Sequence, residues 1–409
     1  MLYQRNLTTK IFTAAKDTPV VMVNGARQTG KSTLMQGLFS VDRPAYITFD
    51  DMDVLGLARS GPQIFVQSLP ERVILDEIQR VPELFLPIKL SVDQNRKPGR
   101  FFITGSANVA SLPKVSESLA GRIEIHTLWP LSQGEIRGKK EGFIDALFSA
   151  KKLPTVKPAT IADILIIANR GGYPEVQKRN LDRRKDWFNS YIATLMERDV
   201  RDLSNIEQLT ALPNLLALLA LRSGGIINNS DLSRTLALPL TTLKRYLSLL
   251  ELLFLVVPLR PWFSNLGKRL IKVPKLYIND SGLLCHLLKS DIKALSVNGT
   301  LLGAVFENFV VMELIKQLTW SKTRANIFHF RTTNGYEVDI VLESDDGKII
   351  GIECKGSATV KADSFKGLKV LKEMTGKKFH RGIVLYAGSH VIGVAEDMQA
   401  VPVSALWDL

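Results

Sequence analysis

The sequence predicts a multidomain α/β protein, and three observations lead to this fold class. An apolar run at residues 20–24 passes into a glycine-rich loop and then a helix-compatible segment, the order found in phosphate-binding parallel sheets. Residues 230–254 read as a short helix, a turn and a longer helix. Two strand-like runs on either side of Asp345-Asp346-Gly347 predict a hairpin in a second α/β region. The chain of 409 residues is long enough for two or three domains.

The glycine-rich loop at residues 25–32 has the spacing Gly-x-x-x-x-Gly-Lys-Ser. Its backbone N–H groups would face phosphate oxygens, Lys31 would reach the β- and γ-phosphates, and the Ser32 hydroxyl would bind Mg²⁺. A chance glycine-rich turn is disfavoured, because the spacing is complete and a strand precedes it. The sequence therefore predicts a nucleotide site with ATP and Mg²⁺ as cofactors. The predicted nucleotide-binding residues are Gly25, Ala26, Arg27, Gln28, Thr29, Gly30, Lys31, Ser32 and Thr33.

Two further strand-like runs end in residues that would complete this site. A P-loop needs an acid for the metal and a group that orients the attacking water. One run ends in Asp76-Glu77, so Asp76 would hold Mg²⁺, directly or through water, and Glu77 would polarise the water. Another ends in Thr104-Gly105-Ser106. Ligands lie at the carboxyl ends of parallel strands, so Ser106 or Thr104 would sense the γ-phosphate or the water.

Together with Ala120-Gly121-Arg122 and residues 129–135, these motifs resemble the AAA+ ATPases of bacteria and archaea that carry a C-terminal domain of unknown function. The similarity extends over nearly the whole chain, with residues 1–140 as the ATPase domain. The resemblance implies that Ser106 is the first sensor and Arg122 an arginine finger for a neighbour's nucleotide, and hence a ring or another homo-oligomer. The alternative for Arg122 is a salt bridge at the start of a strand.

Residues 141–205 are predicted to form a linker and a helical lid. The stretch 138–158 is rich in Lys, Gly and Pro and reads as a connection. A helix is expected at residues 182–202, with acidic and basic side chains at helical spacing. The AAA+ resemblance implies a second arginine sensor in this lid, and Arg198 is the candidate.

Residues 206–295 are predicted to form a winged helix-turn-helix domain. Ser230 or Asp231 would cap the short helix, and Thr241 would cap the longer one. The first turn of the longer helix would meet base edges or phosphates, and the basic segment after it would lie over the phosphate backbone as a wing. A winged helix that binds protein instead is the alternative. The predicted DNA contacts are Thr242, Lys244, Arg245, Lys268, Arg269 and Lys272.

Residues 296–409 contain carboxylates that we expect to converge. A helix at residues 301–318 contains Glu307, and the predicted hairpin brings Asp339 close to Glu353 and Lys355. Residues 353 and 355 share one face of their strand. Asp339 and Glu353 are therefore predicted to bind Mg²⁺, and Asp339, Glu353 and Lys355 to activate water for phosphodiester attack.

The pattern Glu…Asp…Glu-x-Lys resembles the active site of PD-(D/E)xK nucleases, whose core is helix, three strands, helix and strand. Here residues 361–372 would be the second helix and residues 381–386 the following strand. The resemblance implies that Glu307 is a further Mg²⁺ ligand and that the region cleaves DNA with Mg²⁺. The alternative is that the same fold persists as a DNA-binding module with a silent site.

The net charge of +13 favours an anionic partner, first nucleic acid and second a membrane surface. The most apolar run, residues 247–258, is too short for a span of about 20 residues. Two cysteines provide no disulfide framework, and no apolar signal segment begins the sequence, so we expect a cytoplasmic protein without membrane contact.

Three functions remain open from the sequence. The chain could be an ATP-driven DNA nuclease. It could instead be a DNA motor or branched-DNA remodeller with a silent nuclease-like domain. The third alternative is a nucleotide-switched ATPase that binds protein and has no role on DNA. The sequence leaves the form of DNA open.

Overall fold

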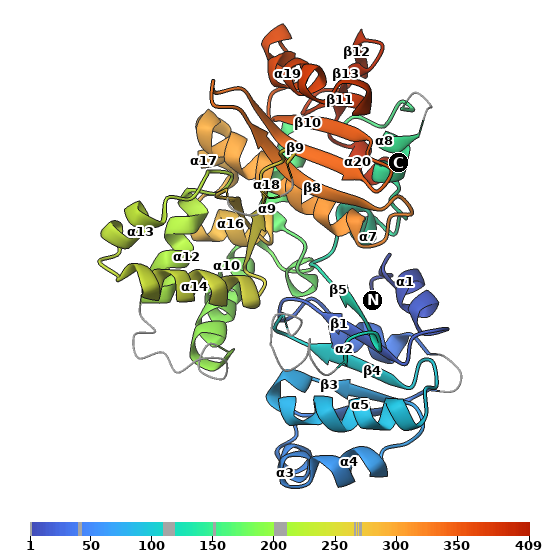
Figure 1. The fold of residues 1–409 in the computed structure, drawn as a ribbon. Coiled ribbons are helices and arrows are strands. Elements are labelled where there is room, and N and C mark those ends of the chain that lie inside the picture. The colour runs from blue at the N-terminus through green and yellow to red at the C-terminus, as the bar shows by residue number, and fades with distance from the viewer. Residues whose placement is uncertain are drawn as a thin grey trace.

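The computed structural model describes residues 2–39, 43–108, 119–149, 153–199, 211–265, 267, 269 and 272–409. Figure 1 shows an N-terminal α/β domain at the bottom, a helical region at the left, and a C-terminal sheet at the top. Lys268, a predicted DNA contact, and the side chain of Arg198, the candidate second sensor, lie outside this description. In the described part of the chain, no helix is long and apolar enough to cross a membrane.

The N-terminal domain is built on a parallel five-stranded sheet in the order β2-β3-β4-β1-β5. β1 and β4 are buried along their whole length because helices cover both faces of the sheet, which confirms the predicted α/β class. The strands are β1 (Val20–Asn24), β2 (Ala45–Thr48), β3 (Val73–Asp76), β4 (Phe101–Gly105) and β5 (Ile123–Thr127). The helices are α1 (Thr8–Ala14), α2 (Lys31–Gly37), α3 (Met52–Ser60), α4 (Pro62–Ser68) and α5 (Phe85–Gln94).

The middle of the chain is mostly helical and contains one antiparallel pair of strands, β6 with β7. A three-helix segment, α12 to α14, leads into this pair. The helices are α9 (Ile161–Arg170), α10 (Leu181–Thr194), α12 (Ala211–Leu221), α13 (Asn229–Thr235), α14 (Leu240–Leu252), α16 (Ser281–Leu287) and α17 (Ile292–Val297). The strands are β6 (Val256–Leu259) and β7 (Lys275–Ile278).

Two predicted helix caps are wrong in this region. The side chain of Asn228, not Ser230 or Asp231, caps α13 by accepting from the backbone N–H of Asp231. Helix α14 follows Pro239 without a side-chain cap, so Thr241 lies inside it. The extended backbone of Pro239 starts this helix without a hydroxyl acceptor.

The C-terminal region contains a mixed six-stranded sheet in the order β12-β13-β11-β10-β9-β8. Strands β8, β9 and β10 are antiparallel neighbours, whereas β10 and β11 are parallel. The helices are α18 (Gly299–Leu318), α19 (Lys366–Thr375) and α20 (Ala405–Asp408). The strands are β8 (Ala325–Arg331), β9 (Glu337–Ser344), β10 (Ile349–Lys355), β11 (Phe379–Tyr386), β12 (Ile392–Ala395) and β13 (Met398–Pro402). The succession α18, β8 to β10, α19 and β11 is the expected helix, three strands, helix and strand.

The helical region and the C-terminal region share one hydrophobic core, which extends from Phe143 to Trp407. The N-terminal sheet has core clusters of its own. Helix α8 (Phe143–Phe148) lies in the stretch that was predicted as a connection, and its Phe143, Ile144 and Leu147 are fully buried. This stretch is therefore part of the shared core.

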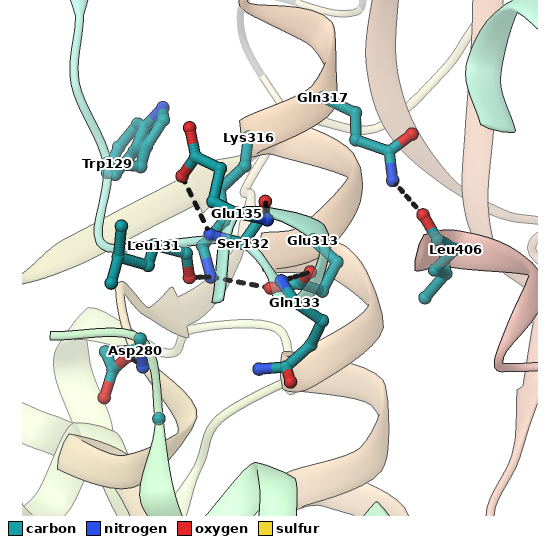
Figure 2. Close-up of polar contacts among 12 residues, drawn as sticks. Trp129, Leu131, Ser132, Gln133, Glu135, Asp280, Glu313, Lys316, Gln317 and Leu406 are labelled. Carbon is teal, nitrogen blue, oxygen red and sulfur yellow. Dashed lines mark hydrogen bonds and ion pairs between the residues drawn. The ribbon is translucent and has the colours of Figure 1, made fainter. Parts of the chain in front are cut away.

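A buried polar junction joins the N-terminal domain to α18 (Figure 2). The ammonium of Lys316 donates to the carbonyl oxygen of Leu131 at 3.0 Å and to Glu313 at 2.7 Å. The other Glu313 oxygen accepts from the backbone N–H of Gln133 at 2.8 Å. Because α18 also carries Glu307, one rigid helix connects the junction with the C-terminal carboxylates.

Candidate functional site

The phosphate-binding loop lies at the carboxyl end of β1 and closes around its own lysine. Gly25 has φ +146°, and a Cβ there would lie 2.2 Å from the carbonyl oxygen of Leu128, so only glycine fits. Lys31 is 4% exposed, and its ammonium donates to the carbonyl oxygens of Gly25 at 3.1 Å and Ala26 at 3.0 Å. A phosphate that enters the loop would replace these carbonyls as the acceptors of Lys31.

The Asp76 carboxylate, at the end of β3, is held by hydroxyl groups. Ser32 Oγ donates to one carboxylate oxygen at 2.8 Å, and the Tyr46 hydroxyl donates to the other at 2.6 Å. Thr104 Oγ1 is a third donor. Burial and the bond to Asp76 raise the pKa of Tyr46 to about 12, so Tyr46 remains a donor. Mg²⁺ prefers oxygen ligands and takes only one or two from the protein beside phosphates, so Ser32 and Asp76 fit this ion.

Glu77 adopts a left-handed backbone with φ +59°, a conformation that is costly for a non-glycine residue and is enriched at active sites. Its carboxylate accepts from Ser106 Oγ at 2.8 Å and from the amide of Gln79. Burial alone would raise the pKa of Glu77, but the charge of Lys31 and these two hydrogen bonds lower it. Glu77 is therefore an ionised acceptor.

Two contacts that the sequence did not predict fix the outer side of the loop. The guanidinium of Arg5 donates to the carbonyl oxygens of Thr29 at 2.8 Å and Trp129 at 2.6 Å, and it pairs with Glu135 at 3.1 Å. The Tyr191 hydroxyl of α10 donates to the carbonyl oxygen of Arg27 at 3.2 Å. The N-terminal segment and the helical region thus both touch the loop. No local sequence signal identifies Arg5, since its partners are distant in the chain.

Two pockets adjoin the loop. The one of about 380 Å³ is lined by Arg27, Glu77, Gln79 and Ser106. The other, of about 660 Å³, is largely apolar, and residues 2–5, Gly30, Leu34 and Pro174 are among those that line it.

Arg122 lies away from the phosphate-binding loop of its own chain. It precedes β5, which pairs in parallel with β1 so that Ile123 lies beside Val20. Arg122 therefore lies at the amino ends of the strands, whereas the loop lies at their carboxyl ends. Its guanidinium forms two bonds with Asp93, at 2.5 and 3.0 Å. Within one chain, Arg122 thus makes the salt bridge that was the alternative prediction.

The predicted DNA contacts fall into two groups. Lys244 and Arg245 are exposed in the first turns of α14, with Thr242 half-buried beside them, and Lys272 is exposed before β7. Arg269 is different, because it is 8% exposed and pairs with Glu343. We therefore correct the prediction for Arg269, whose charge is already compensated and is not available to a phosphate.

The three predicted carboxylates of the C-terminal region do converge, but a lysine of the helical region lies among them. The ammonium of Lys275, on β7, is 3.1 Å from Glu307 Oε1 and 3.8 Å from Asp339 Oδ1. The ammonium of Lys355 is 3.3 Å from Glu353 Oε2. Sequence reasoning missed Lys275, because nothing local to β7 indicates an acidic partner.

A positive charge, the Lys275 ammonium, already lies among the carboxylates of this cluster. Burial and the neighbouring Asp339 raise the pKa of Glu307 to about 6 and that of Glu353 to about 9. Burial would lower the pKa of Lys275, but the facing carboxylates raise it. Within the part of the chain that the structure describes, no three His, Cys, Asp or Glu side chains are grouped so as to hold a metal ion. The cluster does not fit Mg²⁺ in this arrangement, which corrects the prediction that Glu307, Asp339 and Glu353 are its ligands.

Comparison with known families divides the chain into three parts. The AAA domain family matches residues 17–137. Residues 163–294 match a domain of unknown function (DUF8612), and residues 302–406 match another (DUF4143). With the parallel sheet and the P-loop, the first match shows that residues 17–137 form a P-loop ATPase domain of the AAA type. The nuclease resemblance of the C-terminal region stays a prediction.

Two bacterial proteins are similar to this chain. An uncharacterised protein of Mycobacterium tuberculosis is 29% identical over 403 residues, which cover 98% of this chain and 84% of the relative. An uncharacterised protein of Haemophilus influenzae is 24% identical over 334 residues, which cover 74% of this chain and 76% of the relative.

Two solved structures are also similar to this chain. A Walker-type ATPase of Pyrococcus abyssi has a TM-score of 0.42 at 15% identity and covers 70% of this chain and 96% of its own. The RuvB Holliday junction branch migration motor of Thermotoga maritima has a TM-score of 0.30 at 17% identity, with 62% and 88% covered.

Proposed function

We propose that the chain is a Mg²⁺-dependent ATPase that binds DNA and uses hydrolysis to process it. The observation that carries the ATPase assignment is the set of oxygen and ammonium groups around the loop. Ser32 Oγ lies 2.8 Å from Asp76 Oδ1. The Glu77 carboxylate accepts a hydrogen bond from Ser106 Oγ.

Each of these groups has a role in the proposed reaction. A bound Mg²⁺ would neutralise charge on the β- and γ-phosphates. Lys31 leaves the carbonyls of its loop and donates to a phosphate oxygen. Glu77, kept ionised, accepts a hydrogen bond from the attacking water and orients it toward the γ-phosphate. Ser106 and Gln79 fix the direction of that carboxylate.

We assign the larger, mostly apolar pocket to the base and ribose of the nucleotide. It opens beside Gly30 and Leu34, at the start of the helix that follows the loop. Tyr3 and Pro174 bring the N-terminal segment and the helical region to its walls. Nucleotide binding would therefore contact both regions as well as the loop.

The DNA assignment is supported by charge and exposure. The chain carries a net charge of +13. Three basic side chains are exposed where a winged helix would contact DNA. Lys244 and Arg245 lie on α14, and Lys272 lies in the segment before β7. Self-association is part of the proposal, since Arg122 could reach a nucleotide only on a neighbouring chain.

The test is one ATPase assay with duplex, single-stranded and branched DNA. We expect at least one DNA form to accelerate hydrolysis in the unsubstituted chain and Lys31→Ala to abolish hydrolysis under every condition. Glu71→Gln, on the exposed surface at a distance from the loop, is the matched control and should behave as the unsubstituted chain does.

Two results would contradict the proposal in different ways. If Lys31→Ala hydrolysed ATP as fast as the unsubstituted chain, the assignment of the P-loop as the ATPase site would be refuted. Hydrolysis that no DNA changes, together with no salt-sensitive DNA affinity, would refute the DNA assignment. It would leave the nucleotide-switched, protein-binding ATPase.

A further inference from the structure

The carboxylate cluster of the C-terminal region takes its cation from another part of the chain. Glu307 comes from α18, and Asp339 comes from β9. The ammonium between them belongs to Lys275 on β7, which precedes both elements in the sequence. Lys275 is 5% exposed, so its charge has left water almost completely. A buried ammonium is costly unless it is paired or hydrogen-bonded, and these two acids provide the opposite charge.

One oxygen of Glu307 and one of Asp339 already accept hydrogen bonds from the protein. Glu307 Oε1 accepts from both Lys275 and the Tyr277 hydroxyl, the latter at 2.6 Å. Asp339 Oδ1 faces Lys275, and its other oxygen accepts from the backbone N–H of Cys354 at 2.9 Å. Mg²⁺ requires several oxygens at about 2.0–2.1 Å in octahedral geometry. An ammonium at this position excludes that arrangement by charge and by volume.

Lys275 is held in place by its backbone as well as by its charge. β7 pairs with β6, so that Lys275 lies opposite Leu259, and an isolated bridge joins it to Ile226. Tyr277, two residues further, projects from the same face and contacts the same glutamate. The chain at Gly224 packs so closely that a Cβ there would lie 3.2 Å from Glu307 Oε1.

We propose that the Lys275 ammonium is the resident cation of this cluster and takes the place of a divalent metal ion. The cluster then joins the β6–β7 pair to the C-terminal sheet, and the C-terminal region carries out no metal-dependent cleavage at this position. This proposal concerns residues outside the P-loop and does not depend on ATP hydrolysis.

The test is Mn²⁺ binding to nucleotide-free protein, measured by electron paramagnetic resonance and calorimetry. All proteins carry Ser32→Ala, so that the P-loop contributes no signal. We expect no Mn²⁺ site in the chain that retains Lys275. Lys275→Met should gain a Mn²⁺ site, because it leaves two buried carboxylates uncompensated. Adding Asp339→Asn to Lys275→Met should remove the new site.

Lys272→Met is the matched control, because Lys272 is an exposed lysine three residues away and should gain no site. Lys275→Arg keeps the positive charge and should gain none either. The proposal is overturned if the chain with Lys275 binds Mn²⁺ and Asp339→Asn removes that binding. It is equally overturned if folded Lys275→Met gains no site. If Lys275→Met does not fold, the chain that retains Lys275 is compared with and without Asp339→Asn. Equal Mn²⁺ binding by these two proteins supports the proposal.

Discussion

Two clusters of buried carboxylates in the described part of the chain each lie beside a lysine that the sequence does not place in an ion pair, and the lysine is bonded differently in the two. At the P-loop, Lys31 donates to backbone carbonyls, while Asp76 accepts from hydroxyls. In the C-terminal region, Lys275 pairs directly with Glu307 and lies near Asp339.

The difference shows why similar residue types lead to different chemistry. The hydroxyl of Ser32 can give up its hydrogen bond and offer a lone pair to a metal ion, because an oxygen is both donor and acceptor. An ammonium has no lone pair and carries the charge that a metal ion would bring. The Asp76 carboxylate is therefore open to a metal ion, whereas an ammonium already faces Glu307 and Asp339.

The largest effect is expected from removing the carboxylate charge at the P-loop. Glu77→Gln should lower kcat for ATP hydrolysis by about 10² to 10⁴, the range for a lost general base, with nucleotide affinity nearly unchanged. Phosphate release and binding of a fluorescent nucleotide measure the two effects. Glu83→Gln is a control in the same segment. Comparable turnover in Glu77→Gln and Glu83→Gln would reject this role of Glu77.

Removing each lysine should lower the free energy of unfolding by a different amount in the two clusters. Lys275→Ala should cost about 3–5 kcal/mol, because it leaves Glu307 and Asp339 buried without their cation. Lys31→Ala should cost less, about 1.5–3 kcal/mol, because Lys31 donates hydrogen bonds to two neutral carbonyls and its charge lowers the pKa of Glu77. Denaturant unfolding gives both values. If the two substitutions cost the same, the contrast between an ion pair and a carbonyl cradle is wrong.

A smaller effect is expected from pH at Glu353. Its pKa is about 9 in the folded chain because of burial and Asp339, and its ordinary value is 4.5. The folded state thus holds a proton that the unfolded state loses, so the contribution of Glu353 to stability falls as pH rises from about 4.5 to about 9. Glu353→Gln should flatten this fall. Melting temperatures of both proteins from pH 5 to pH 9 test it, and parallel curves would contradict the assigned shift.

The smallest effect is expected at the exposed basic residues. Lys244→Gln should weaken DNA binding several-fold and reduce the salt dependence of the affinity by about one unit of slope, as loss of one phosphate contact does. Arg269→Gln is the informative comparison, because Arg269 is buried against Glu343. It should lower stability and leave the salt slope unchanged. Fluorescence anisotropy at several salt concentrations measures the slopes, and a lower slope in Arg269→Gln would reverse the correction.

Much of the fold was predictable because its signals are local. The strands of the N-terminal sheet are short apolar runs, and each functional segment follows directly after one of them. Parallel strands end at the same edge, so Lys31, Asp76 and Ser106 could be grouped in advance. The hairpin of β9 and β10 places Asp339 beside Glu353 by the same kind of argument, since Ile340 pairs with Ile352.

The predictions failed where composition or residue type was the only guide. A stretch rich in Lys, Gly and Pro concealed α8, because three apolar side chains suffice for a short helix that packs on an existing core. The cap of α13 is an asparagine two residues before the predicted serine. In both cases, tertiary packing selects one of several local conformations that the sequence allows.

The sequence by itself determined the phosphate-binding loop, because the glycines, the lysine and the serine must be adjacent in the chain to surround a phosphate. Tertiary structure decided what the buried charges do. Arg5 reaches the loop, Arg269 is neutralised by Glu343, and Lys275 enters the C-terminal carboxylates, each across a long stretch of sequence. A buried charge must be compensated by whichever opposite charge folding brings near it, and no local pattern names that partner.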